Sequence, residues 1–281
     1  MDGSNGDERV GWWLWLNVVN LDAPLVAVVW QLLLAGSMHV RLNAYEPWAL
    51  GLAVWLIYIA DHLIDTLRPA KGGWEAPRKQ FFRRHWRAGL GLASGIGGAL
   101  VGCGSRFLWV PTIRGGLQLS IGVVGYFSVI HLMPARWRIR WPREVVVALL
   151  FTLGTFGAVW LGNGRKATPL AVPAAIFILL CSTNCALIET WEWEAGGGFD
   201  APDTPNWAAR WIARHTGWVA GVIVCLAVSN PSEFAMAGVM SALGLWLLAA
   251  KRTAIGIRLV SPVADLALCT PLVMLAGEWL R

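Results

Sequence analysis

The feature that most constrains the fold is a succession of apolar segments, each close to the length of a membrane-spanning helix. Such a helix needs about 20 mostly apolar residues to cross the hydrocarbon core of a bilayer. The segments predict an all-α, polytopic membrane protein with nine transmembrane helices. Pro24 and Pro173 predict kinks or breaks in the first and sixth helix. The segments are about 12–36, 47–66, 88–107, 110–132, 144–162, 168–190, 215–230, 233–250 and 259–280.

The composition is that of a membrane protein. The chain is 56% hydrophobic and 14% charged, whereas about a quarter of the residues in a soluble domain are charged. Many of its 19 tryptophans flank the apolar segments, where their amphipathic rings favour the headgroup region. All five cysteines fall within apolar segments without a Cys-x-x-Cys pair. We therefore interpret them as small core residues and predict neither a disulfide framework nor a zinc site.

The basic residues predict the orientation. Of the 23 lysines and arginines, 17 fall on one side of the predicted bundle, in the N-terminal segment and in every second loop. Basic loops stay in the cytoplasm, so we expect the N-terminus inside and the C-terminus outside. The net charge of +6 is then mainly an orientation signal, and no nucleic-acid partner is expected. The predicted location is the bacterial inner (cytoplasmic) membrane.

The third segment carries four glycines at helical spacing. Gly91-x-x-x-Gly95 and Gly98-x-x-x-Gly102 place small residues along one helix face. Such a face lets another helix approach closely. We interpret it as ordinary packing within the bundle.

Two aspartates end the second segment. Asp61 and Asp65 are four residues apart and share one face of a helix. Two carboxylates at a membrane boundary are costly unless a cation neutralises them. A divalent metal carrying a diphosphate is one such partner and Arg68 is another. We favour the metal, because one arginine would leave the second carboxylate poorly paired. His62 points off the carboxylate face by helical geometry and is expected to be interfacial.

A second acidic cluster ends the sixth segment on the same side of the predicted bundle. Glu189 and Glu192 are three apart, and Glu194 follows them. They are either metal ligands or a solvated helix end that runs into the loop 196–198. Two segments that both end in acidic pairs predict two similar halves, about 12–132 and 144–280, within a single domain of residues 1–281.

On these two clusters the chain resembles the UbiA superfamily of intramembrane prenyltransferases. The first family motif, Asn-Asp-x-x-Asp-x-x-x-Asp, is matched in its last part by Asp61 and Asp65. Its leading Asn-Asp is replaced by Ile57 and Tyr58. The second motif is matched only in position and charge, by glutamates in place of aspartates.

The resemblance implies nine helices around a central cavity, with the active side facing the cytoplasm. The implied reaction transfers an isoprenoid chain from a polyprenyl diphosphate to a lipophilic acceptor, which in the family is often an aromatic ring. The implied cofactor is Mg²⁺, which would assist ionisation of the diphosphate and would be held by Asp61, Asp65, Glu189 and Glu192. The implied diphosphate-binding residues are Arg68, Arg136, Arg138, Arg140 and Arg143, although topology alone also explains the last four.

Other functions remain open. The altered motifs favour a non-catalytic UbiA-like subunit, structural or pigment- or lipid-binding, within a larger membrane complex. A UbiA-type terpene cyclase would share the ionisation step. A transporter ranks last, because both clusters lie at helix ends and not at the bilayer midplane. Asp22 and Asp265 are further intramembrane carboxylates and hence functional candidates. Helix capping is the alternative for Asp22, and no partner is predicted for Asp265.

Overall fold

The computed structural model describes residues 15–67, 77–134, 140–196, 204–252 and 257–279. Over these residues the chain forms helices and no strand, which confirms the all-α prediction for the described part. The helices are α1 (Trp15–Val18), α2 (Asp22–Ser37), α3 (Tyr45–Thr66), α4 (Pro77–Arg84), α5 (Trp86–Phe107), α6 (Val110–Leu132), α8 (Arg143–Gly162), η2 (Thr168–Leu170), α9 (Ala171–Ala195), α10 (Trp207–Arg214), α11 (Thr216–Ser229), α12 (Glu233–Ala250), α13 (Ile257–Ala267) and α14 (Pro271–Trp279).

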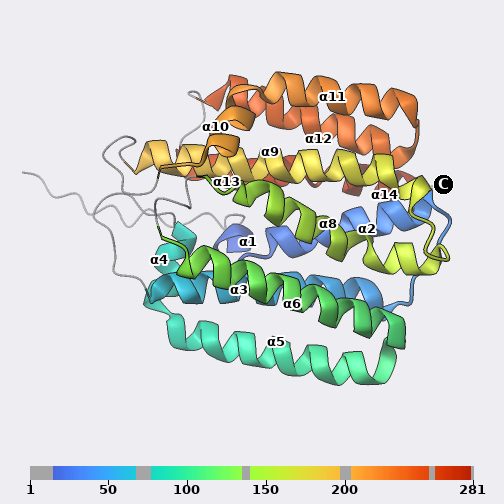
Figure 1. Ribbon diagram of the computed structural model, residues 1–281, viewed down its shortest axis with the longest axis horizontal. Coiled ribbons are helices and arrows are strands. Elements are labelled where there is room, and N and C mark those ends of the chain that lie inside the picture. The colour runs from blue at the N-terminus through green and yellow to red at the C-terminus, as the bar shows by residue number, and fades with distance from the viewer. Residues whose placement is uncertain (1–14, 68–76, 135–139, 197–203, 253–256, 280–281) are drawn as a thin grey trace, which may run out of the picture.

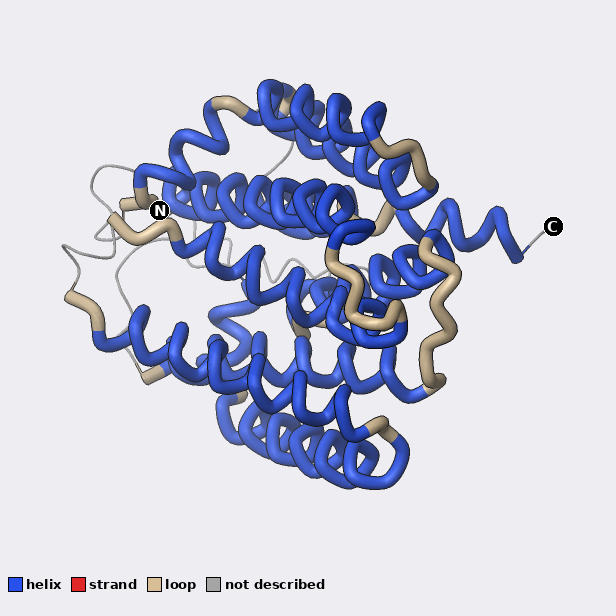
Figure 2. The backbone as a smooth tube through the Cα atoms, turned by 45° about the vertical axis from the view of Figure 1, so that its right-hand side comes forward, coloured by secondary structure: helices blue, strands red, loops and turns tan. Residues whose placement is uncertain are grey.

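The long helices lie roughly side by side in one bundle (Figures 1 and 2). Helix α5 lies at one edge of the bundle in Figure 1, α11 and α12 lie at the other, and α9 runs between them. Helix α9 packs against α8, α10, α12 and α13, whereas α5 packs mainly against α3. The short helices α4 and α10 both lie at the left end of the bundle in Figure 1.

Six described helices are long and apolar enough to cross a membrane: α3, α5, α6, α8, α9 with η2, and α12. The number rises to eight if each of two bent pairs forms one span. Helices α10 and α11 meet at 75°, and α13 and α14 meet at 44°. Helix α2 is apolar but only 16 residues long. These helices indicate a membrane protein, while the nine-span count and the orientation of the N-terminus stay predictions.

The helix breaks agree with the sequence prediction only in part. Pro24 and Pro173 both lie in the first turn of their helices, where the missing N–H has no partner to lose. The prediction of a kink or break is wrong for Pro173, whereas the first predicted segment is broken four residues before Pro24, at the residue whose carbonyl the proline ring would meet in a continuous helix. Asn20, with a left-handed φ of 57°, separates α1 from α2. The two large bends fall at His215 and at residues 268–270.

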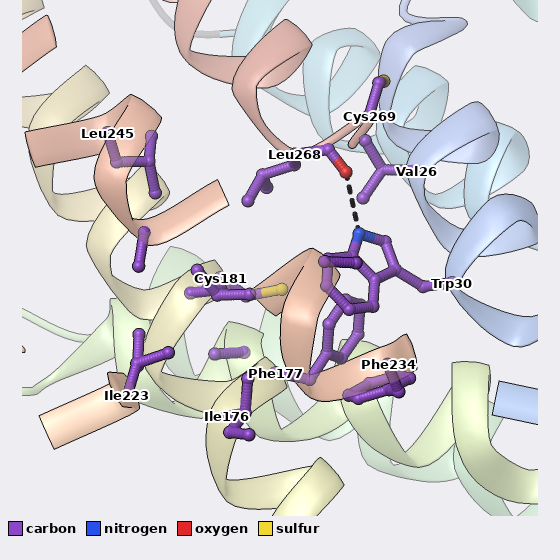
Figure 3. Close-up of a cluster of buried hydrophobic side chains, with 14 of the residues drawn as sticks. Val26, Trp30, Ile176, Phe177, Cys181, Ile223, Phe234, Leu245, Leu268 and Cys269 are labelled. Carbon is purple, nitrogen blue, oxygen red and sulfur yellow. Dashed lines mark hydrogen bonds between the residues drawn. The ribbon is translucent and has the colours of Figure 1, made fainter. Parts of the chain in front are cut away.

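The main core forms where α2, α9 and α12 meet. Trp30 is fully buried, and its ring lies 4.8 Å from that of Phe234 and 5.2 Å from that of Phe177 (Figure 3). Its indole N–H donates to the carbonyl oxygen of Leu268 at 2.8 Å. Leu268 lies at the bend between α13 and α14, so this bond satisfies a carbonyl that the broken helix leaves without a partner.

The glycine face of α5 has no neighbour among the described residues. A methyl group placed at Gly91, Gly95, Gly98 or Gly102 would have no atom of another element within 4 Å. All four glycines are exposed. The expectation that this face packs within the bundle is therefore wrong for the part of the chain that the structure describes.

Candidate functional site

The charged residues of interest gather at one end of the bundle. Helix α3 ends there with its two aspartates, and α9 ends there with its glutamates. The first residue of α8, Arg143, and the first turns of α4 bring cations to the same place, as the ion pairs below show. Four helices, α3, α4, α8 and α9, thus contribute to one polar region, which we call the charged mouth.

Asp61, His62 and Asp65 form a compact group on α3. One potential ligand atom from each of them lies within 4.8 Å of the other two. His62 is buried, and the two aspartates are partly buried. Among the described residues this is the one group of three or more histidine, cysteine or carboxylate side chains with the spacing of a metal site.

His62 is not the interfacial side chain that the sequence predicts. Its side chain is buried and its ring stacks on that of Phe82, with 5.4 Å between the centroids. Its Nε2 lies 3.2 Å from Oδ1 of Asn20, an atom that can only accept, so Nε2 carries the proton. Nδ1 is buried without a hydrogen-bond partner. The lone pair that remains on Nδ1 is therefore available as a ligand.

Glu189 is held by an arginine. Arg143 Nη2 lies 3.2 Å from Oε1 of Glu189, and Arg143 Nε lies 3.1 Å from Oε1 of Glu144. Glu144 is buried, and its Oε2 accepts from Nδ2 of Asn206 at 2.6 Å. Asn206 also caps α10 by accepting from two backbone N–H groups. This chain of contacts fixes Arg143 between α8, α9 and α10.

Glu192 is held by two cations from α4. Arg78 Nη2 lies 2.5 Å from Oε1, and Lys79 Nζ lies 3.2 Å from Oε2. Burial lowers the pKa of Arg78, but Glu192 outweighs this effect and raises the pKa above its ordinary range. Only 15% of the Glu192 side chain and 17% of the Glu189 side chain are exposed. The alternative of a solvated helix end is therefore wrong for both, although Glu194 is 41% exposed beside Arg252.

The structure also connects the two acidic clusters. Asp61 interacts electrostatically with Arg143 and Lys79, the cations that bind Glu189 and Glu192. The sequence places both clusters on one side of the bundle but does not single out Arg78 and Lys79, which lie in the short basic helix α4 of sequence Pro-Arg-Lys-Gln-Phe-Phe-Arg-Arg.

Two of the predicted diphosphate-binding arginines, Arg140 and Arg143, belong to the described residues. Arg143 lies in the charged mouth. The backbone carbonyl of Arg140 accepts from the indole N–H of Trp207 at 3.2 Å. Arg68, Arg136 and Arg138 lie outside the described residues.

A second polar group lies deeper in the bundle. Asn17 Nδ2 lies 2.6 Å from Oδ2 of Asp22 and 3.4 Å from Oδ2 of Asp265. Asn184 Nδ2 donates to Oδ1 of Asp265 at 2.7 Å. The side chains of Asp22 and Asp265 also interact electrostatically with each other. Asp265, for which the sequence predicted no partner, is therefore surrounded by polar groups from three other segments.

Arg78 interacts electrostatically with this deeper group as well. Its guanidinium acts on Asp265, Asp22 and Tyr58, in addition to its ion pair with Glu192. Tyr58 lies three residues before Asp61 on α3, and Asn184 lies five residues before Glu189 on α9. The deep group therefore forms a second polar layer beneath the charged mouth.

Comparisons with protein-family models, with curated proteins and with solved structures found no match to this chain.

Proposed function

We propose that the protein is a Mg²⁺-dependent intramembrane prenyltransferase, similar to the UbiA superfamily. It would transfer an isoprenoid chain from a polyprenyl diphosphate to a lipophilic acceptor. One observation carries the proposal: an acidic group of metal-site spacing, Asp61, His62 and Asp65, lies beside the cations Arg78, Lys79 and Arg143. A metal–diphosphate complex needs both kinds of partner, carboxylates for the metal and cations for the phosphates.

The donor set at the end of α3 fits a divalent metal. The carboxylates of Asp61 and Asp65 would supply the oxygen ligands that Mg²⁺ prefers, and a ring nitrogen of His62 lies close enough to be a third donor. Bound there, Mg²⁺ would neutralise charge on a leaving diphosphate. The predicted second metal set, Glu189 and Glu192, fits less well, because the oxygens of these carboxylates bind cations.

The ion pairs of α9 have a role of their own in this proposal. Glu189 and Glu192 hold Arg143, Arg78 and Lys79 in the charged mouth. Arg143 and Lys79 interact electrostatically with Asp61, and Arg78 interacts with His62. A diphosphate would compete with the glutamates for these cations, since phosphate oxygens are strong acceptors for guanidinium groups. The glutamates would then act as positioning residues for cations instead of as metal ligands.

The basic loops support an orientation with the charged mouth in the cytoplasm. Soluble diphosphates made in the cytoplasm would then reach it directly, and the lipophilic acceptor would come from the surrounding lipid. The location that follows is the bacterial inner membrane.

Diphosphate release in lipid nanodiscs tests the proposal. The purified protein is incubated with Mg²⁺ and with geranyl, farnesyl or geranylgeranyl diphosphate, with and without mixtures of aromatic acceptors. We expect Mg²⁺-dependent release that Asp61→Asn/Asp65→Asn abolishes. Glu194→Gln is the matched control, because Glu194 belongs to the same helix end but pairs with the exposed Arg252, and it should retain activity.

The same experiment separates the alternatives. Release with a hydrocarbon product and no acceptor would identify a terpene cyclase. No release with any chain length would contradict catalysis and favour the non-catalytic subunit. The open glycine face of α5 is consistent with such a subunit, which should then purify with other membrane proteins.

A second candidate function is proton-coupled transport, and the deep polar layer favours it. Asp265 lies three residues before the bend between α13 and α14, and Asp22 begins α2 just after the break at Asn20. Carboxylates at interrupted helices are typical of ion-coupled transporters. In proteoliposomes, proton flux that Asp265→Asn abolishes and Asp61→Asn leaves intact would support transport over prenyl transfer.

A further inference from the structure

A pocket lies at the end of the bundle opposite the charged mouth. Its volume is about 430 Å³, within the usual range for small-molecule sites. Glu46 in the first turn of α3 lines it, whereas Asp61 and Asp65 lie in the last two turns of the same helix. The pocket therefore belongs to neither the proposed active site nor the deep polar layer.

The walls of the pocket are held together by hydrogen bonds around a buried carboxylate. Oε2 of Glu46 accepts from the backbone N–H of Asn43 at 3.0 Å, and Oε1 accepts from the hydroxyl of Thr112 at 2.9 Å. Nδ2 of Asn43 donates to the carbonyl oxygen of Phe107 at 2.9 Å. The Tyr45 ring stacks on that of Phe107, with 4.5 Å between the centroids. These contacts join the loop before α3 to the last residue of α5 and to the first turn of α6.

Two arginines supply the free charge of the pocket. Arg41 and Arg106 both line it and are both exposed. Neither forms an ion pair within the described part of the chain. Among the described residues, the carboxylate that lines the pocket is that of Glu46, and both of its oxygens already accept hydrogen bonds. The pocket thus presents two unneutralised guanidinium groups.

The position of the pocket adds an apolar component. It lies where α3 and α6 begin and α5 and α8 end, which is the headgroup level of a membrane-spanning bundle. Leu108 and the 59% exposed Trp109 line it beside the arginines. Trp side chains favour this level of the bilayer, and guanidinium groups bind phosphate in a bidentate manner.

We propose that the pocket formed around Arg41 and Arg106 binds a phosphate group, carried by a phospholipid headgroup or by a soluble phosphate. The two guanidinium groups bind the phosphate oxygens. For a lipid, Leu108 and Trp109 contact the first carbons of the chains. Glu46 positions the loop that carries Arg41 and does not contact the ligand.

Native mass spectrometry tests the site on the full chain purified in detergent. Phosphatidylglycerol is titrated onto the wild-type protein and onto Arg41→Gln/Arg106→Gln. We expect one tightly bound lipid in the wild type and about tenfold weaker binding or more in the double variant. Arg114→Gln is the matched control, since Arg114 is an exposed arginine near the start of the adjacent α6 that does not line the pocket. It should bind as the wild type does.

Competition identifies the source of the phosphate. If the pocket selects lipids, inorganic phosphate and glycerol 3-phosphate will leave the bound phosphatidylglycerol in place. If the pocket selects a soluble phosphate, inorganic phosphate or glycerol 3-phosphate will displace the bound phosphatidylglycerol at a concentration below that of the lipid. Equal binding by the wild type and the double variant, or an equal loss in Arg114→Gln, would overturn the proposal. Arg41→Lys/Arg106→Lys guards against misfolding, because it keeps the charge and should bind with intermediate affinity.

Discussion

The two carboxylate groups of the molecule are neutralised in different ways. In the charged mouth, Glu192 binds two cations. In the deep polar layer, Asp22 and Asp265 contact each other and two asparagine amides. The deep layer thus holds its carboxylates mainly with neutral amides, and Arg78 acts on them electrostatically. In the mouth, a ligand can replace a partner of an ion pair, whereas the deep layer depends on hydrogen bonds between side chains.

The largest expected effect concerns the acidic group of the mouth. Asp61→Asn/Asp65→Asn should lower the rate of diphosphate release by about a thousandfold or more, because charge stabilisation at the leaving group is lost. Steady-state assays in nanodiscs measure the rate, and a chelator added to the wild type should reproduce the loss. A variant that keeps its activity with an unchanged melting temperature would refute the metal role.

The second largest effect is expected on the free energy of unfolding, and it tests the ion pairs of Glu192 in the charged mouth. Glu192→Gln leaves Arg78 and Lys79 without their anion in a largely buried site. Removing one partner of a buried ion pair costs about 3 kcal/mol, and unfolding in mixed micelles measures the loss. The double variant Glu192→Met/Arg78→Met should recover part of the stability, since the most buried ion pair is then absent and only the more exposed Lys79 is left without its anion. If Glu192→Gln unfolds as the wild type does, the ion pairs contribute little.

A smaller effect is expected where the mouth is fixed to α10. Asn206→Ala removes both the cap of α10 and the hydrogen bond to Glu144. Loss of an N-cap costs about 1 kcal/mol and loss of a hydrogen bond to a charged group about 1.5 kcal/mol. The same unfolding assay should show a loss of that order. Ser232→Ala, which removes only the cap of α12, should cost less and serves as the comparison.

The smallest effect is expected in the deep layer. Asp265→Asn replaces a carboxyl by an amide of the same shape, and an amide can still hydrogen-bond to Asp22. The free energy of unfolding should change by less than about 1 kcal/mol. A loss as large as that of Glu192→Gln would show that Asp265 is ionised in the folded protein and that the two regions are neutralised in the same way.

Much of the fold was predictable because length and hydropathy determine a membrane span. The predicted segments 110–132 and 233–250 coincide with α6 and α12, and 144–162 begins one residue after the first residue of α8. The break at Asn20 was predictable in part from Pro24, four residues later, whereas no proline marks the bend at His215. A break there depends on the helices that pack around it.

The site was predictable only in part. Asp61 and Asp65 share a helix face, so their proximity follows from spacing alone. Arg78 and Lys79 were missed because many basic residues lie in the same predicted loop and topology explains them all. The deep layer brings together Asn17 and Asp265, 248 residues apart, and no local pattern indicates that pairing.

The hydrogen bond from Trp30 to the carbonyl of Leu268 has a consequence for the order of assembly. A bend inside a lipid-embedded span exposes a carbonyl that lipid cannot satisfy. Helix α2 precedes α13 and α14 in the chain, so the bend between them packs against a partner that was synthesised before it. A variant that lacks α2 should therefore leave this bend without a hydrogen-bond donor for its carbonyl.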